Sequence, residues 1–134
     1  MYPKGNLNIP VSHGQLEAIL KEPAGDIKGA ALVSHPHPLG GGTMHNKVVY
    51  RAATGFAEAG FVTLRFNFRG VGASTGAHDD GDGERQDVKD ALDYLTKNYP
   101  SHPLTLAGFS FGSRVGTEVA LDDERVERLI SIGT

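Results

Sequence analysis

One segment of the chain could carry nucleophilic chemistry. Residues 108–112 read GFSFG, so Ser110 stands in a G-x-S-x-G pattern between a short apolar run and a stretch with helical periodicity. A sharp turn from strand to helix exposes such a serine, whose hydroxyl can then attack a carbonyl carbon. The turn leaves no room for side chains two residues away, which explains Gly108 and Gly112. The helix start would direct the Phe111 N–H toward the oxyanion that the attack creates.

A second segment could bind that oxyanion or another anion. Residues 34–42 read SHPHPLGGG and directly follow a buried apolar run. Proline has no N–H, so Pro36 and Pro38 cannot donate a hydrogen bond. Only His37 and Leu39 can therefore offer backbone donors close to the strand end.

Both segments also have simpler interpretations. Glycine makes up 18 of the 134 residues, so either segment could be an ordinary turn that serves packing alone. A metal site built from His35, His37 and His45 is a further alternative, although zinc or nickel normally needs three or four convergent ligands. The chain has no cysteine, which excludes thiol nucleophiles, disulfides, CxxC redox motifs and cysteine-bound zinc.

Two segments resemble nucleotide-binding motifs but lack a required part of each. The glycines of residues 69–76 lack the immediate helix of a dinucleotide-binding fingerprint, and residues 42–47 lack the GK[ST] ending of a phosphate loop. The segment at 78–84, which is rich in acidic residues, does not form a calcium loop, because Arg85 stands where glycine is required. We interpret them as negative charges gathered at a helix N-terminus, where the helix dipole favours them.

The elements around these motifs alternate between strand and helix. Residues 7–11 and 16–20 alternate apolar and polar positions on either side of a turn, which predicts a hairpin. Further strands are expected at 30–33, 61–68, 104–107 and 129–132, and helices at 46–59, 84–98 and 114–121. This order predicts an α/β fold, a three-layer α/β/α sandwich with a mostly parallel, doubly wound sheet and an N-terminal antiparallel hairpin. Chemistry in such sheets lies beyond the carboxyl ends of the strands.

Composition narrows the function further. The length of 134 residues predicts a single domain, and the net charge of −3 gives no footprint for nucleic-acid binding. No apolar run approaches the roughly 20 residues of a membrane helix. The N-terminal residues have no apolar core of a secretory signal, so we expect a cytoplasmic protein without a membrane association.

Taken together, these motifs resemble the N-terminal part of an α/β hydrolase. The resemblance rests on HPHP at residues 35–38, on RGVGAS at 69–74 as the family's R-G-x-G-x-S, and on the serine turn at 108–112. It extends over nearly the whole chain from about Gly29. The segment GDGE at 81–84, with Asp87 ahead of a helix, is similar to small uncapped bacterial members related to dienelactone hydrolases and serine peptidases.

The resemblance implies a role for each of these residues. Ser110 would be the nucleophile, and the N–H groups of Phe111 and His37 would form the oxyanion hole, with Leu39 as a substitute donor. The reaction would be hydrolysis of a small-molecule carboxylic ester, thioester or amide through an acyl-enzyme, without metal or organic cofactor. The alternative is a binding module of the same fold, or an inactive fragment, in which the chemistry is absent.

The sequence departs from the family in one respect. The triad order of the family is serine, then Asp or Glu, then histidine, but all six histidines of this chain precede Ser110. The acidic residues after it lie in and beyond the following helix, away from the strand ends. We therefore expect the triad acid and base beyond residue 134, in a single domain of which residues 1–134 are the first part. His37 as a surrogate base is the remaining alternative.

A sheet that stops at the strand predicted for residues 129–132 would expose an apolar edge. Edges of this kind promote pairing with other chains. We therefore expect homodimerisation or aggregation through this strand.

Overall fold

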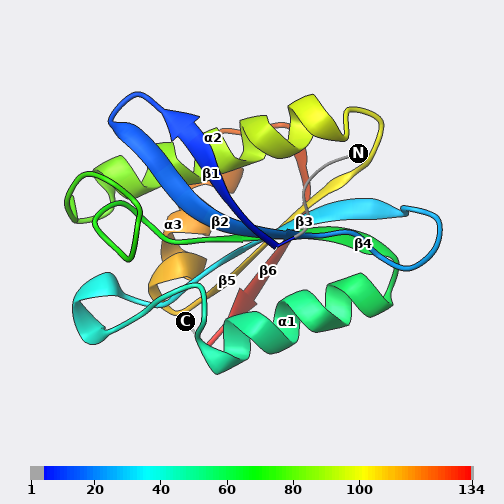
Figure 1. The fold of residues 1–134 in the computed structure, drawn as a ribbon, viewed down its shortest axis with the longest axis horizontal. Helices are drawn as coiled ribbons and strands as arrows, with labels where there is room; N and C mark the ends of the chain where they lie inside the picture. Colours follow the sequence, from blue (N-terminus) through cyan, green and yellow to red (C-terminus); the bar gives the residue numbers. More distant parts are fainter. Residues whose placement is uncertain (1–4, 134) are drawn as a thin grey trace.

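A mixed sheet of six strands forms the centre of the molecule (Figure 1). The computed structural model describes residues 5–133. The strands are β1 (Gly5–Val11), β2 (Gly14–Lys21), β3 (Gly29–Ser34), β4 (Phe61–Phe66), β5 (Leu104–Phe109) and β6 (Val126–Ile132). The helices are α1 (Lys47–Glu58), α2 (Asp82–Asn98) and α3 (Phe111–Ala120), with a short 3₁₀ helix at Pro38–Gly40.

The strand order across the sheet is β1-β2-β4-β3-β5-β6. The β1–β2 hairpin is antiparallel and β2 pairs antiparallel with β4, whereas β4, β3, β5 and β6 run parallel to one another. The predicted α/β class, the hairpin and the parallel part of the sheet are thus confirmed. Strands β3 and β5 are neighbours, so their carboxyl ends bring the histidine-rich loop next to the serine turn.

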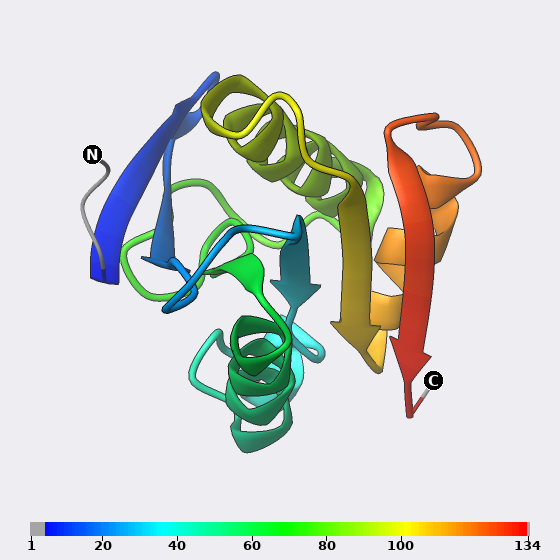
Figure 2. The ribbon, with the colours of Figure 1, turned by 90° about the vertical axis from the view of Figure 1, so that its right-hand side faces the viewer.

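Helices cover both faces of the sheet. Figure 2 shows α1 on one side and α2 on the other. The larger core joins α2 and α3 to the sheet through buried residues such as Leu92, Val115, Leu32 and Phe66. The smaller core lies under α1, where Val49 and Ala53 pack on Val33 and Ala107. The three layers are those expected from the sequence.

Several boundaries differ from the sequence prediction for local reasons. Helix α3 begins at Phe111 instead of residue 114, because the turn at Ser110 leads into it directly. Strand β4 ends at Phe66 instead of residue 68, since the Phe68 N–H donates to a histidine side chain and not to a neighbouring strand. Within residues 5–133, no helix is both long and apolar enough to span a membrane.

Candidate active site

Ser110 lies in the turn between β5 and α3, at the carboxyl end of the parallel strands. Its backbone angles are φ 57° and ψ −114°, so a residue with a side chain occupies a region that such residues rarely adopt. The Ser110 N–H donates to the carbonyl of Ile132 over 3.0 Å, which ties the turn to β6. This strained serine at a strand–helix junction matches the turn predicted from the sequence.

The two glycines of the motif allow the turn to close. A β-carbon on Gly108 would lie 2.5 Å from the carbonyl of Gly112 and 2.6 Å from the Ser113 nitrogen. A β-carbon on Gly112 would lie 2.6 Å from the carbonyl oxygens of Ser34 and His35. Real β-carbons do not approach backbone atoms so closely, so both positions require glycine.

Phe111, the first residue of α3, lies between the serine and the histidine-rich loop. As the first helical residue it has no intrahelical acceptor for its N–H. Its ring is buried against the rings of His37, at a centroid distance of 4.7 Å, and Phe68, at 5.5 Å. The side chain thereby anchors the start of the helix next to the loop.

The loop after β3 is shaped by the side chain of His37. His37 caps the 3₁₀ helix, and its Nδ1 accepts a hydrogen bond from the Leu39 N–H over 3.1 Å. The Leu39 N–H is therefore occupied, which leaves the His37 N–H as the available donor of the predicted pair. Because Nδ1 uses its lone pair as an acceptor, Nε2 carries the proton in the neutral ring. This tautomer argues against His37 as the base that activates Ser110.

Comparison with known proteins agrees with this geometry. The family model described as "alpha/beta hydrolase fold" matches residues 38–134. The chain belongs to this family. RP471, an uncharacterized protein of Rickettsia prowazekii (strain Madrid E), is 44% identical over 103 residues, which are 76% of this chain and 43% of that protein.

Two solved structures are similar to this α/β hydrolase over almost its whole length. An alpha-beta serine hydrolase homologue from Coxiella burnetii superimposes with a TM-score of 0.93 at 42% identity, over 98% of this chain and 64% of that one. XC6422 from Xanthomonas campestris, a serine hydrolase without a lid, gives 0.89 at 38% identity, over 98% and 62%. The chain thus spans less than two thirds of the length of each of these relatives.

His35 holds the end of β3 in this α/β hydrolase, a role that its position in the sequence did not reveal. The side chain is fully buried, and its Nε2 accepts from the Phe68 N–H over 3.0 Å while Nδ1 donates to the Pro36 carbonyl over 2.7 Å. Burial lowers the pKa of His35 from 6.5 to about 4, although the hydrogen bond to Pro36 acts in the opposite direction. Both nitrogens are engaged, so His35 is a structural residue and not a metal ligand.

The candidate metal site is not assembled by the fold. Among residues 5–133 there is no group of three or more histidine, aspartate or glutamate side chains that could hold a metal ion. The His37 ring packs on Phe111, and the exposed His45 belongs to the turn before α1.

The R-G-x-G-x-S segment, residues 69–74, fixes the loop that follows β4. The buried carboxylate of Asp87 in α2 accepts from the Arg69 N–H over 2.9 Å and from its Nη2 over 2.8 Å. The Ser74 hydroxyl donates to the Asn67 carbonyl over 2.7 Å and accepts from the Glu17 N–H over 2.8 Å. These contacts join the loop to the hairpin and to α2.

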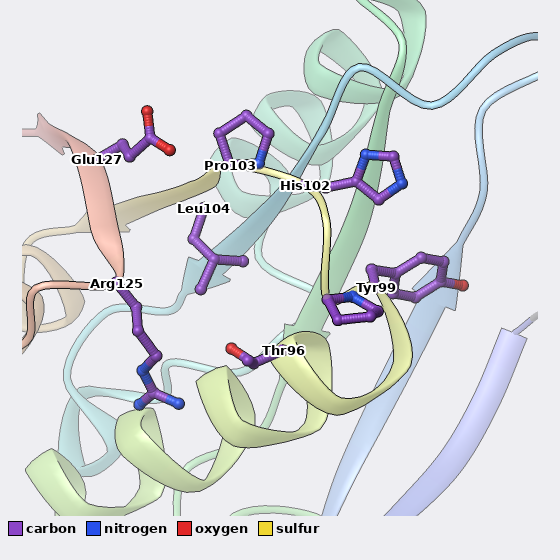
Figure 3. A pocket seen from close by; sticks show the side chains of 8 residues that line it. Thr96, Tyr99, His102, Pro103, Leu104, Arg125 and Glu127 are labelled. Atoms are coloured by element: carbon purple, nitrogen blue, oxygen red, sulfur yellow. The ribbon is translucent and has the colours of Figure 1, made fainter.

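The acidic residues that follow α3 lie at the other end of the sheet from Ser110. Asp123 precedes β6 and pairs with Arg125 over 2.7 Å, and this contact lowers the pKa of the Asp123 carboxyl. Arg125 and Glu127 line a cavity of about 180 Å³ beside the start of β5, drawn in Figure 3. Since Ser110 follows the far end of β5, these carboxylates stand too far away to orient a catalytic base, as the sequence predicted.

Proposed function

We propose that this α/β hydrolase is a serine hydrolase that cleaves a carboxylic ester, thioester or amide through an acyl-enzyme on Ser110. The observation that carries the proposal is the strained backbone of Ser110, at φ 57° between β5 and α3. Such strain persists only where the surrounding structure enforces it, and it concentrates at functional sites. The serine hydrolase names of the two similar structures support the same assignment.

The first step is attack of the Ser110 hydroxyl oxygen on the substrate carbonyl carbon. The hydroxyl proton passes to a general base, and the carbonyl oxygen becomes a tetrahedral oxyanion. The N–H groups of Phe111 and His37 are the donors that we assign to this oxyanion. Collapse of the intermediate expels the alcohol, thiol or amine with the proton and leaves the acyl group on Ser110, from which water releases it.

We also propose that the general base and its carboxylate partner are residues outside 1–134. His35 donates and accepts within the loop, and His37 Nδ1 accepts from Leu39. Neither His35 nor His37 is thus free to take the serine proton. A small-molecule substrate and a cytoplasmic location, both predicted from the sequence, are parts of the same proposal.

A fluorophosphonate probe tests the proposal on the whole gene product that contains these residues. We expect covalent labelling that disappears in Ser110→Ala and persists in Ser113→Ala, a second serine of the same helix region. Absence of labelling in the folded wild-type protein would contradict the proposal. The protein would then be a binding module of the same fold.

A further inference from the structure

A third aromatic ring lies against both residues assigned to the oxyanion hole. The ring centroid of His78 is 4.9 Å from that of His37 and 5.7 Å from that of Phe111. His37 and Phe111 are themselves 4.7 Å apart, so the three rings form a closed triangle. His78 comes from the long loop between β4 and α2, which no motif in the sequence connects to the serine turn.

Two carboxylates flank the ring of His78. Its Nδ1 lies 3.1 Å from Oε2 of Glu84, and its Nε2 lies 3.3 Å from Oδ1 of Asp80. Both distances are within ion-pair range, but neither contact has the direction of a hydrogen bond, although both nitrogens are buried. The His78 ring therefore lies between these two carboxylates and the rings of His37 and Phe111, against which it packs.

The Glu84 carboxylate beside His78 is fixed in position. The Glu84 side chain is fully buried, and its two oxygens accept from the N–H groups of Asp79 and Gly81, each over 2.9 Å. A buried carboxylate with two backbone donors is fixed at the first turn of α2. The Glu84 carboxylate therefore gives the His78 ring a fixed neighbour in α2.

We propose that His78 is a positioning residue that holds the two oxyanion donors of this serine hydrolase in place, an inference that rests on the proposed function. Its contact with the His37 ring constrains the loop after β3, which carries the His37 N–H. Its contact with the Phe111 ring constrains the first turn of α3. Oxyanion donors act only when they point at the developing charge, so small displacements reduce the rate strongly. His78 would thus affect the chemical step without contact with substrate.

The experiment compares His78→Ala and His78→Phe in the whole gene product, with His102→Ala as the control. His102 lies at the amino end of β5, away from Ser110. Hydrolysis of p-nitrophenyl acetate gives kcat and KM, and the fluorophosphonate reaction rate gives an independent measure of oxyanion stabilisation. The melting temperature of each variant shows whether it is folded.

We expect His78→Ala to lower kcat and the labelling rate by on the order of tenfold or more, with KM changed less than about twofold. His78→Phe keeps the ring contacts and should recover most of the rate, and His102→Ala should match wild type. If both His78 variants fold and react at the wild-type rate, the proposal is wrong.

Three further outcomes also test the role of His78. A loss in His78→Ala that His78→Phe does not restore would overturn the packing role. If His78→Ala does not fold, His78→Phe alone decides, because its rate must then stay close to wild type. If wild type itself is not labelled at Ser110, the proposed function fails first and the role of His78 fails with it.

Discussion

Gly112 touches the backbone of His35 so closely that a β-carbon on it would lie 2.6 Å from the His35 carbonyl oxygen. This contact joins the first turn of α3 to the end of β3. The serine turn and the histidine-rich loop thus pack directly against each other, backbone to backbone. The relative position of the Phe111 and His37 N–H groups depends on this contact.

Gly112→Ala should therefore disrupt both stability and the serine turn. The added methyl group has to push β3 and α3 apart, and overpacking of this kind costs about 1–3 kcal/mol. We expect the free energy of unfolding in urea to fall by that amount and the fluorophosphonate labelling rate of Ser110 to fall at least tenfold.

Gly55→Ala is the matched control for that substitution. Gly55 lies inside α1 with open space around the position of a β-carbon. Alanine is the better helix former, so stability should rise by about 0.5–1 kcal/mol with no change in labelling. A similar loss of stability in both variants would show that the contact with His35 is not the cause.

The fold could be predicted from the sequence because its signals are local. Continuous apolar runs marked the buried strands, and the spacing of Val88, Ala91, Leu92 and Leu95 marked α2, which all four residues attach to the core. The order of strand and helix then leaves few topologies. Boundaries were less accurate where side chains replace backbone partners, as at Phe68, whose N–H donates to His35.

The site could be predicted only in part. The serine turn was visible from its G-x-S-x-G pattern, although the turn itself excludes a side chain only at Gly108, and Gly112 is required by the backbone of β3. The roles of His35 and His78 depend on contacts with Phe68 and Glu84, which other elements supply. Such contacts have no spacing rule, so the sequence could not distinguish a structural histidine from a ligand or a base.

The buried His35 should make the fold sensitive to mild acid. Its pKa is lowered to about 4 in the folded state and is 6.5 when unfolded, so between these values the unfolded chain binds a proton that the folded chain excludes. Stability is therefore lost as the pH falls through this window, by about 2 kcal/mol between pH 7 and pH 5. Urea unfolding at the two pH values measures the loss.

His35→Gln separates this residue from the other titrating groups. Glutamine can accept a hydrogen bond from the Phe68 N–H but does not titrate. We expect the variant to be somewhat less stable at pH 7 and to lose about 2 kcal/mol less than wild type on going to pH 5. If both proteins lose the same stability between pH 7 and pH 5, groups other than His35 cause the loss.

The Arg69–Asp87 pair should contribute more than the ion pairs on the surface of α2. The Asp87 side chain is fully buried and that of Arg69 is 16% exposed, so Asp87→Ala leaves a poorly hydrated arginine without its partner. Loss of one partner from a buried pair costs about 3–5 kcal/mol. Asp82→Ala, which removes an exposed partner of Arg85 in the same helix, should cost less than about 1 kcal/mol. Equal midpoints in urea for the two variants would refute this ranking.

The outer edge of β6 should make residues 1–134 associate when they are produced alone. β6 is the outermost strand of the described sheet on its side, and Leu129 on it is 37% exposed. The opposite edge, β1, carries Pro10, which has no N–H and hinders pairing. A charged, hydrated lysine on an edge strand opposes pairing with a strand of a second chain.

Leu129→Lys should therefore reduce self-association of residues 1–134, seen in sedimentation velocity as a shift from larger species toward the monomer. Leu121→Lys adds the same charge at a residue that is 81% exposed but lies beyond α3, away from any strand. If hydrophobic exposure alone drove association, Leu121→Lys would have the larger effect, because Leu121 is the more exposed of the two. If strand pairing drives it, only Leu129→Lys should act. A monomeric wild-type chain at high protein concentration would rule out both causes.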